Sequence, residues 1–310
     1  MSVQTKPDPS QTISSFQAWV LGARPKTLPA AAAPVLIGCA VAFAEGGFRW
    51  LPALITLLAA LLLQIGANLA NDYFDFIKGA DQGERLGPTR VTQSGLLAPQ
   101  TVRTGMWITF VLAAFCGIYL AWVSGWWIIV IGILAILAAI AYTGGPFPYG
   151  YKGLGEIFVF LFFGLAAVGG TYYAQTQTIS WLAVLSSFPV GLMICAILVI
   201  NNLRDLDNDR KSNKNTLAVK FGKHWTQQEF IAFLALAYLI VFLMGISALA
   251  SPWILISWLS LPFIFPLSHS VIHDSGKKLN KTLAGMGQLT LLFSLLYSIG
   301  LILAVYFPIG

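Results

Sequence analysis

The chain has 310 residues, of which 57% are apolar and 10% are charged. A soluble domain usually carries about a quarter charged residues, so the composition excludes an ordinary water-soluble protein and indicates an integral membrane protein. The net charge of +6 could suit nucleic acid, but the placement of the basic residues argues against that partner, as shown below.

The N-terminal segment is polar, and no basic start leads into a short apolar core. It therefore does not resemble a cleaved secretory signal. Residues 13–27 are expected to lie along the membrane surface, with Phe16 and Trp19 toward lipid. The three cysteines lie in apolar runs without CxxC spacing, which predicts neither a disulfide framework nor a zinc site.

Nine apolar stretches follow, each long enough to cross a hydrocarbon core about 30 Å thick. We place them at approximately 28–45, 50–70, 104–123, 126–143, 155–173, 182–201, 228–248, 252–271 and 287–307. The sequence therefore predicts an all-α polytopic membrane protein, with a polar tail and interfacial segment at 1–27 and one nine-helix domain at 28–310.

The Lys and Arg residues predict the orientation of these helices. If the N-terminus is cytoplasmic, 17 of the 18 fall in cytoplasmic segments and only Arg49 falls outside. Cytoplasmic segments of membrane proteins carry such an excess of positive charge. We therefore expect a cytoplasmic N-terminus, an external C-terminus and a location in the cell membrane, the inner membrane where there are two. Chemistry is expected at the cytoplasmic face, where the long loops 71–103 and 202–227 lie.

The second apolar stretch ends in NLANDYFDFIKGAD (68–81), where acids and amides are concentrated. In a helix Asn71 and Asp75 share a face, with Asn68 and Asp72 alongside. Asp81 is the next carboxylate along the chain. One such cluster is often only a solvated helix end, but a second cluster occupies the corresponding place four spans later.

The second cluster is NNLRDLDND (201–209), in which Asn202, Asp205 and Asp209 fall on one helical stripe. Carboxylates this close resist burial near lipid unless a cation compensates them. Oxygen ligands of this kind suit Mg²⁺, which is commonly held by one or two carboxylates together with substrate phosphates. Two facing clusters therefore predict two Mg²⁺ ions bridged by a diphosphate. The candidate metal ligands are Asn71, Asp72, Asp75, Asp81, Asp205 and Asp209.

Basic and amide side chains near the two clusters are expected to bind the substrate. Basic residues in the following loops could neutralise phosphate oxygens that no metal reaches. No P-loop motif is present, so a nucleotide is not the expected carrier of the diphosphate. The candidate substrate-binding residues near the clusters are Asn68, Lys78, Arg85, Arg90, Asn202, Arg210 and Lys214.

At these residues the sequence resembles the UbiA-type intramembrane prenyltransferases. Members of that family carry an N-D-x-x-D-x-x-x-D motif after the second of nine helices and a D-x-x-x-D motif after the sixth. Here the first motif begins Asn71-Asp72-Tyr73-Phe74-Asp75 and the second runs from Asp205 to Asp209. Gly79 stands where the family pattern expects the last Asp of the first motif, so Asp81 ranks below Asn71 and Asp75 as a ligand.

Further segments resemble the menaquinone branch of this family, namely ARPKTL, RLGPTRVTQSG, PYGYKGLGE and NNLRDLDNDRKSNKNTL. The resemblance implies Mg²⁺-dependent transfer of a polyprenyl group from polyprenyl diphosphate to 1,4-dihydroxy-2-naphthoate. Diphosphate and CO₂ would leave, and demethylmenaquinol would form. The implied partners are the prenyl donor, the aromatic acid and the lipid bilayer, with no nucleic acid.

That reaction calls for a base for a phenolic proton and a cation for the carboxylate of the acceptor. Tyr142, Lys152 and Glu156 flank the connection between the fourth and fifth spans and are candidates by location, as are Arg24 and Lys26. We take Tyr142 and Lys152 as catalytic candidates beside Asn71, Asp75, Asp205 and Asp209. Arg24, Lys26 and Glu156 are substrate-binding candidates.

Two alternatives stay open. The shared motifs do not separate this acceptor from 4-hydroxybenzoate, homogentisate or a chlorophyll precursor. A cation-coupled transporter or channel could also use carboxylates within its helices, but it would place them near the membrane midplane rather than at helix ends.

Overall fold

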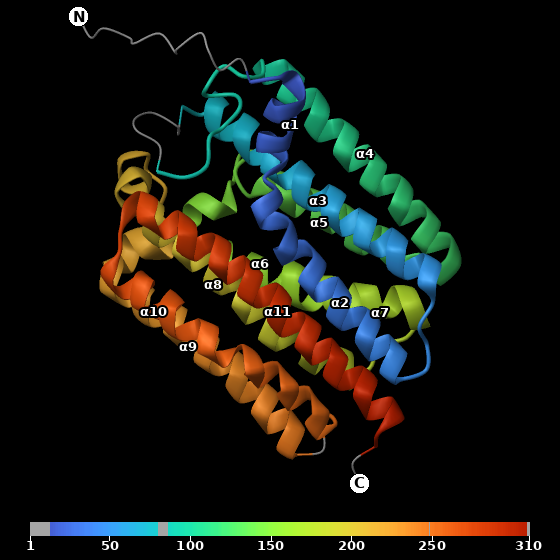
Figure 1. Cartoon of the computed structure of the whole chain (residues 1–310). Coiled ribbons are helices and arrows are strands. Elements are labelled where there is room, and N and C mark those ends of the chain that lie inside the picture. The colour runs from blue at the N-terminus through green and yellow to red at the C-terminus, as the bar shows by residue number, and fades with distance from the viewer. Residues whose placement is uncertain (1–12, 80–85, 248, 309–310) are drawn as a thin grey trace, which may run out of the picture.

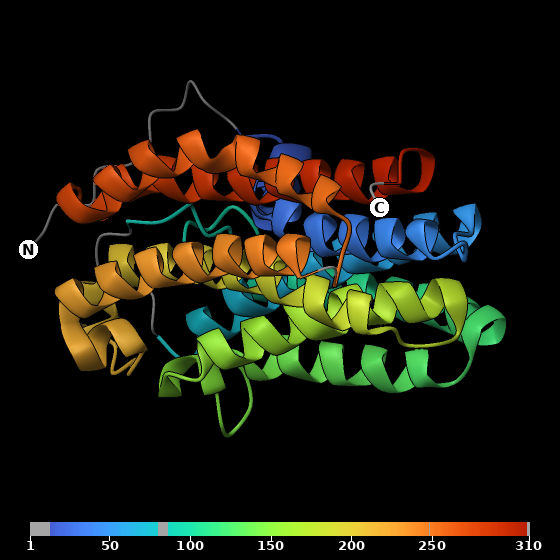
Figure 2. The same ribbon diagram turned by 90° about the horizontal axis from the view of Figure 1, so that it is seen from below.

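The computed structural model describes residues 13–79, 86–247 and 249–308, and all of the regular elements within them are helices. Figures 1 and 2 show long helices that run side by side in a bundle, with the connections gathered at its two ends. Eight helical segments of the described chain are long and apolar enough to cross a membrane, and a ninth apolar helix is shorter. The predicted all-α fold with nine crossings is therefore confirmed.

The membrane helices follow one another in the predicted order. Their bounds are α2 (Leu28–Ala44), α3 (Trp50–Ile77), α4 (Pro99–Ser124), α5 (Trp127–Ala141), α6 with η3 and α7 (Gly155–Val159, Phe160–Ala166, Ala167–Thr176), α8 (Trp181–Lys211), α9 (Leu217–Ile246), η4 with α10 (Pro252–Phe263, Ile264–His273) and α11 (Leu279–Tyr306). The short elements are α1 (Ser15–Ala23), η1 (Pro25–Thr27), η2 (Tyr149–Lys152) and η5 (Gly276–Lys278).

The helices α3 and α8 continue beyond the apolar stretches that define them. As a result both motifs lie in the last turns of a helix, and α9 begins within the loop predicted at 202–227. The predicted loops 71–103 and 202–227 are thus partly helical. A helix with acidic and amide side chains can continue past the lipid, because its polar groups can form hydrogen bonds there with water or with one another.

Small residues let the membrane helices approach closely. A Cβ on Gly66 of α3 would lie 2.5 Å from the ring of Phe110 on α4, and one on Gly38 of α2 would lie 2.7 Å from Thr171 on α7. Within lipid no hydrophobic gain drives helices together, so close packing of this kind carries much of the association.

The helix that carries each motif packs most extensively against the helix that follows it, α3 against α4 and α8 against α9. The two motif helices share this packing relation, in line with the corresponding places of the two motifs in the sequence. In membrane proteins built from repeats the site commonly lies at the interface between the repeats.

At the opposite end of the bundle, Arg49 joins three helices. Its side chain donates to Ser124 Oγ (2.8 Å) and to the carbonyl oxygens of Val123 (3.3 Å) and Ala174 (2.6 Å). Its backbone N–H donates to Gln175 Oε1 at 2.6 Å. The start of α3 is thereby fixed to the ends of α4 and α7.

The helix α1 begins with a capping box and leads to the site. Ser14 Oγ accepts from the Gln17 backbone N–H (3.2 Å), and Gln17 Oε1 accepts from the Ser14 backbone N–H (2.9 Å). Phe16 is exposed, while the ring of Trp19 packs on Gly105 of α4. The helix ends at Arg24, whose φ of 53° turns the chain toward α2.

Candidate active site

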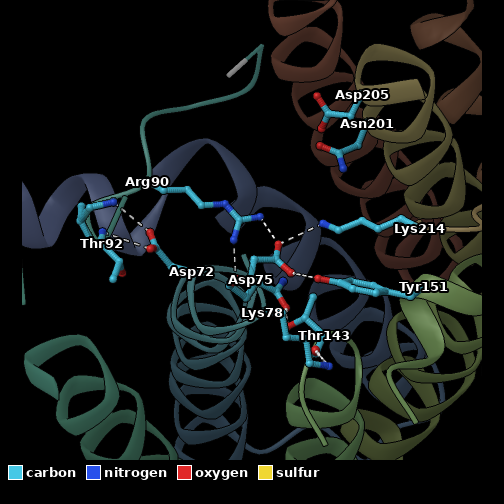
Figure 3. A network of polar contacts seen from close by, with 12 residues as sticks. Asp72, Asp75, Lys78, Arg90, Thr92, Thr143, Tyr151, Asn201, Asp205 and Lys214 are labelled. Carbon is cyan, nitrogen blue, oxygen red and sulfur yellow. Dashed lines mark hydrogen bonds and ion pairs between the residues drawn. The ribbon is translucent and has the colours of Figure 1, made fainter. Parts of the chain in front are cut away.

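The carboxylate of Asp75, buried in the last turn of α3, is the centre of a polar network (Figure 3). Its Oδ2 pairs with the Arg90 guanidinium and with Lys214 Nζ, the latter at 3.2 Å, and its Oδ1 accepts from the Tyr151 hydroxyl. Two cations on one carboxylate leave an excess of positive charge. This arrangement suits an anionic ligand with several oxygens.

Asp72, one turn earlier, is also buried but has different partners. Its two oxygens accept from the backbone N–H groups of Val91 (3.0 Å) and Thr92 (3.2 Å). These bonds fold the segment after the motif back onto α3. They also place Arg90, which donates to the Asn71 carbonyl oxygen as well as to Asp75.

The connection between α5 and α6 supplies the other side of the first motif. Asn71 Oδ1 accepts from Thr143 Oγ1 at 3.0 Å, and Lys78 Nζ donates to the Thr143 carbonyl oxygen at 2.6 Å. The ring of Tyr151 lies under Lys78 Nζ and Lys214 Nζ, at 5.3 and 4.7 Å from the ring centroid. Thr143 and Tyr151 were not among the predicted site residues, although both lie in the connection between the fourth and fifth spans that supplied Tyr142 and Lys152 as candidates.

In the second motif, Asn201 and Asp205 share a face of α8 (Figure 3). Arg204 holds both, since its Nη2 donates to Asn201 Oδ1 (2.6 Å) and to Asp205 Oδ2 (2.5 Å), and its Nε donates to Asp205 Oδ1 (2.9 Å). Asn202 points elsewhere and donates to Glu156 Oε1 at 2.9 Å. By its position the residue that corresponds to Asn71 is Asn201, which was not among the predicted site residues, and the shared N-x-x-x-D spacing was the signal for it.

Lys214 connects the two motifs. It follows α8, pairs with Asp75 of α3 and interacts electrostatically with Asp209. Asp209 also interacts with Asp75 and with Asp205. The two acidic clusters thus face one site, as the sequence led us to expect.

A cavity of about 560 Å³ opens beside this network. Near the motifs its lining is polar and comes from η1 and the ends of α1, α3, α5 and α8, with Arg24, Lys26, Asn68, Asn71, Tyr142 and Asn201. The remaining lining is mostly apolar, with Thr27, Thr56, Gln64 and Thr171 as polar exceptions, and comes mainly from α2 to α5, η3, α7 and α8. A charged mouth with a long apolar interior fits an amphipathic substrate that has a charged head and a hydrocarbon tail.

Two features shape the wall of this cavity. The segment η3 is π-helical, a form that widens the helix and often occurs at functional sites, and its Phe162 and Phe163 line the cavity. Tyr149 stacks on Phe158 with ring centroids 4.0 Å apart. Tyr142, at the end of α5, lines the cavity and packs edge-on against Tyr149 with ring centroids 5.4 Å apart.

Several predicted site residues lie away from the cavity. Lys152 is exposed and rests over the Phe147 ring at 5.8 Å, and Arg210 is exposed on α8. Glu156 is buried behind the cavity wall with Asn202. Asp81 and Arg85 lie outside the described residues.

The donor set fits Mg²⁺. Within the described chain no three His, Cys, Asp or Glu residues form a metal cage of their own. The carboxylates of Asp75, Asp205 and Asp209 come from two helices beside amide oxygens. An ion here would be held by few protein ligands together with substrate oxygens, which is the usual coordination of Mg²⁺.

A helical membrane bundle with two Asn/Asp motifs at one end of an apolar cavity defines an intramembrane enzyme for an amphipathic, anionic substrate. Residues 31–286 match the UbiA prenyltransferase family, and the chain belongs to this family.

Curated relatives cover most of the chain. It is 41% identical over 250 residues to the 1,4-dihydroxy-2-naphthoate octaprenyltransferase of Mycobacterium tuberculosis, an alignment that covers 81% of this chain and 84% of the relative. It is 37% identical over 305 residues to the Escherichia coli protein of the same name, with 95% and 98% covered.

Solved structures share the fold. A UbiA homolog from Archaeoglobus fulgidus, determined with DMAPP and Mg²⁺ bound, superposes with a TM-score of 0.62 at 15% identity, over 92% of this chain and 99% of that one. The apo UbiA homolog from Aeropyrum pernix gives a TM-score of 0.65 at 14% identity, over 94% and 99%.

Proposed function

We propose that this enzyme transfers a polyprenyl group from polyprenyl diphosphate to 1,4-dihydroxy-2-naphthoate, with release of diphosphate and CO₂, to give demethylmenaquinol in menaquinone biosynthesis. Relatives of that name at 37% and 41% identity support the choice of acceptor. The observation that carries the reaction type is the Asp75 network with its two cations, beside a largely apolar cavity that Asn71 of the same motif lines.

The reaction divides between the two parts of the site. Arg90 and Lys214 bind the diphosphate and stabilise the charge that grows on it as the allylic C–O bond breaks and its electron pair goes to the leaving group. The apolar cavity holds the prenyl chain and excludes water, which would otherwise capture the allylic cation. The acceptor ring carbon then forms the new C–C bond, and its carboxylate leaves as CO₂, returning the bonding pair to the ring.

Mg²⁺ is the proposed cofactor, with two ions. The relative from Archaeoglobus fulgidus was solved with Mg²⁺ and DMAPP. In this chain Asn71, Asp75, Asp205 and Asp209 are the proposed ligands, with Asp81 as a further candidate. When bound, Mg²⁺ would neutralise the negative charge of the diphosphate leaving group.

The acceptor is proposed to bind at the polar mouth of the cavity. Arg24 and Lys26 line it and supply positive charge for the acceptor carboxylate. Tyr142, whose hydroxyl is a hydrogen-bond donor, lines the same cavity and is proposed to donate to an acceptor oxygen. We also propose that this mouth faces the cytoplasm, because 17 of the 18 Lys and Arg then lie on the inside.

The test is acceptor specificity in membranes that contain the enzyme. Membranes would be incubated with Mg²⁺, a polyprenyl diphosphate and one aromatic acid at a time. We expect a prenylated product and labelled CO₂ from carboxyl-labelled 1,4-dihydroxy-2-naphthoate, and neither from 4-hydroxybenzoate or homogentisate. Prenylation of the benzoate but not of the naphthoate would refute the proposed acceptor.

A further inference from the structure

Arg204 belongs to the second motif and is almost fully buried, with 4% of its surface exposed. Two of its guanidinium nitrogens hold Asn201 and Asp205, as described above. Its third nitrogen, Nη1, donates to Asn280 Oδ1 at 3.0 Å. Asn280 belongs to the first turn of α11, outside both sequence motifs.

Asn280 also binds the segment that follows the first motif. Its Nδ2 donates to the Leu86 carbonyl oxygen at 2.7 Å. The next residue, Gly87, packs against the guanidinium so closely that a Cβ there would lie 2.8 Å from Arg204 Nη2. This segment continues to Arg90, which pairs with Asp75. One amide thus contacts both the segment that follows the first motif and the arginine of the second motif.

The geometry of Arg204 depends on these contacts. A guanidinium is planar, so fixing one nitrogen restricts the orientation of the other two. If Asn280 were shortened, Nη1 would lose its acceptor in a buried place and the group would turn to find another. Asn201 and Asp205 would then lose their common donor, and Asn201 lines the cavity.

We propose that Asn280 is a positioning residue for the diphosphate end of the site. It fixes the Arg204 guanidinium, which in turn orients the Asn201 amide and the Asp205 carboxylate, and it holds the segment that carries Arg90. The proposal rests on the proposed function only in naming a prenyl diphosphate as the substrate. Inorganic diphosphate would bind to the site through the same groups.

The test compares three variants of the purified full-length chain in detergent. Asn280→Ala removes both amide contacts. Gly87→Ala displaces the guanidinium without altering Asn280. Gln288→Ala, an exposed position two turns further along α11, is the matched control.

The first measurement is binding of inorganic diphosphate in the presence of Mg²⁺ by calorimetry, which needs no prenyl transfer. We expect the Kd to rise about tenfold in Asn280→Ala and in Gly87→Ala, the effect of losing one buried hydrogen bond, and to stay unchanged in Gln288→Ala. The second measurement is the steady-state rate. We expect the KM for prenyl diphosphate to rise by a similar factor while the KM for the aromatic acceptor stays within about twofold.

Thermal unfolding without Mg²⁺ separates positioning from a purely structural role. A lower unfolding temperature with unchanged diphosphate Kd in both variants would overturn the proposal, and so would an equal rise of both KM values. Weaker diphosphate binding in both variants supports the proposal even if the naphthoate is not the acceptor. Should Asn280→Ala not fold, the Gly87→Ala result decides alone.

Discussion

Asp72 and Asp75 lie one helical turn apart on α3, yet the structure gives them different partners. Asp75 holds two cationic side chains and a hydroxyl, whereas Asp72 holds two backbone N–H groups. We infer that Asp75 takes part in binding the diphosphate and its metal. Asp72, which the sequence made a candidate metal ligand, is occupied as an anchor for the segment that carries Arg90.

The first prediction concerns Asp75→Asn. The amide lacks the negative charge that holds Arg90 and Lys214 and turns an NH₂ group toward their N–H donors. We expect kcat/KM for prenyl transfer to fall by at least about 100-fold, as for other groups that stabilise developing charge. The control is Asp207→Asn, an exposed acid of the second cluster, which should leave the rate within about twofold. Asp75→Asn activity above a tenth of that of the unmodified enzyme would contradict the assigned role.

The second prediction concerns Asp72→Asn. An asparagine keeps one acceptor oxygen but sets its NH₂ against the N–H of Val91 or Thr92, which leaves a buried donor without an acceptor. We expect a loss of about 1–3 kcal/mol in the free energy of unfolding, seen as a lower unfolding temperature in the absence of Mg²⁺ and substrate. If stability is unchanged while activity is lost as in Asp75→Asn, Asp72 is a ligand rather than an anchor.

Single residues show where sequence reasoning ends. Helical spacing and charge identified Asn71, Asp75, Asp205 and Lys214. The first three could be found because they lie at helical spacing within a motif, and Lys214 because it lies in the loop directly after the second motif. Tyr151, the neighbour of the candidate Lys152, was not predicted, because its orientation in the short helix η2 depends on a contact with Asp75, 76 residues away. Asn201 was likewise not predicted, because its place in the cavity lining and the contact of Asn202 with Glu156 depend on tertiary packing.

At the level of helices, apolar length predicted all nine crossings but not their packing. Which faces meet depends on small residues opposite large ones, as at Gly66 and Phe110. The π-helical form of η3 also could not be read from its composition, which is simply apolar. Such details follow from tertiary contacts that no local pattern encodes.

The third prediction therefore concerns the α3–α4 contact. Gly66→Ala places a methyl group 2.5 Å from the Phe110 ring, which forces the two helices apart. We expect about 1–3 kcal/mol of destabilisation, measured as a lower unfolding temperature in detergent. Gly169→Ala is the control, since a Cβ at this helical glycine meets nothing within 4 Å. Adding Phe110→Leu should restore part of the loss, and equal stability of Gly66→Ala and Gly169→Ala would show that the contact does not limit packing.

For the molecule as a whole, charge placement and architecture agree. The N- and C-terminal ends of the described chain lie at opposite ends of the bundle, as an odd number of crossings requires (Figure 1). Arg49, the single basic residue predicted outside, is engaged by Ser124 and by carbonyl oxygens of two helices. Arg49 therefore links helices at that end, and its position does not conflict with the orientation that the other basic residues predict.

The last prediction tests that orientation directly. In a chain whose three cysteines are replaced by alanine, a single cysteine is placed at Thr178, exposed between α7 and α8, or at Ser275, exposed before α11. Ser275 lies at the motif end, because the next residue, Gly276, packs near Leu86. The excess of Lys and Arg at this end favours the cytoplasm, so an impermeant maleimide added to intact cells should label Thr178→Cys and not Ser275→Cys. Opening the cells should make Ser275→Cys reactive, and the reverse pattern in intact cells would place the diphosphate site on the external face.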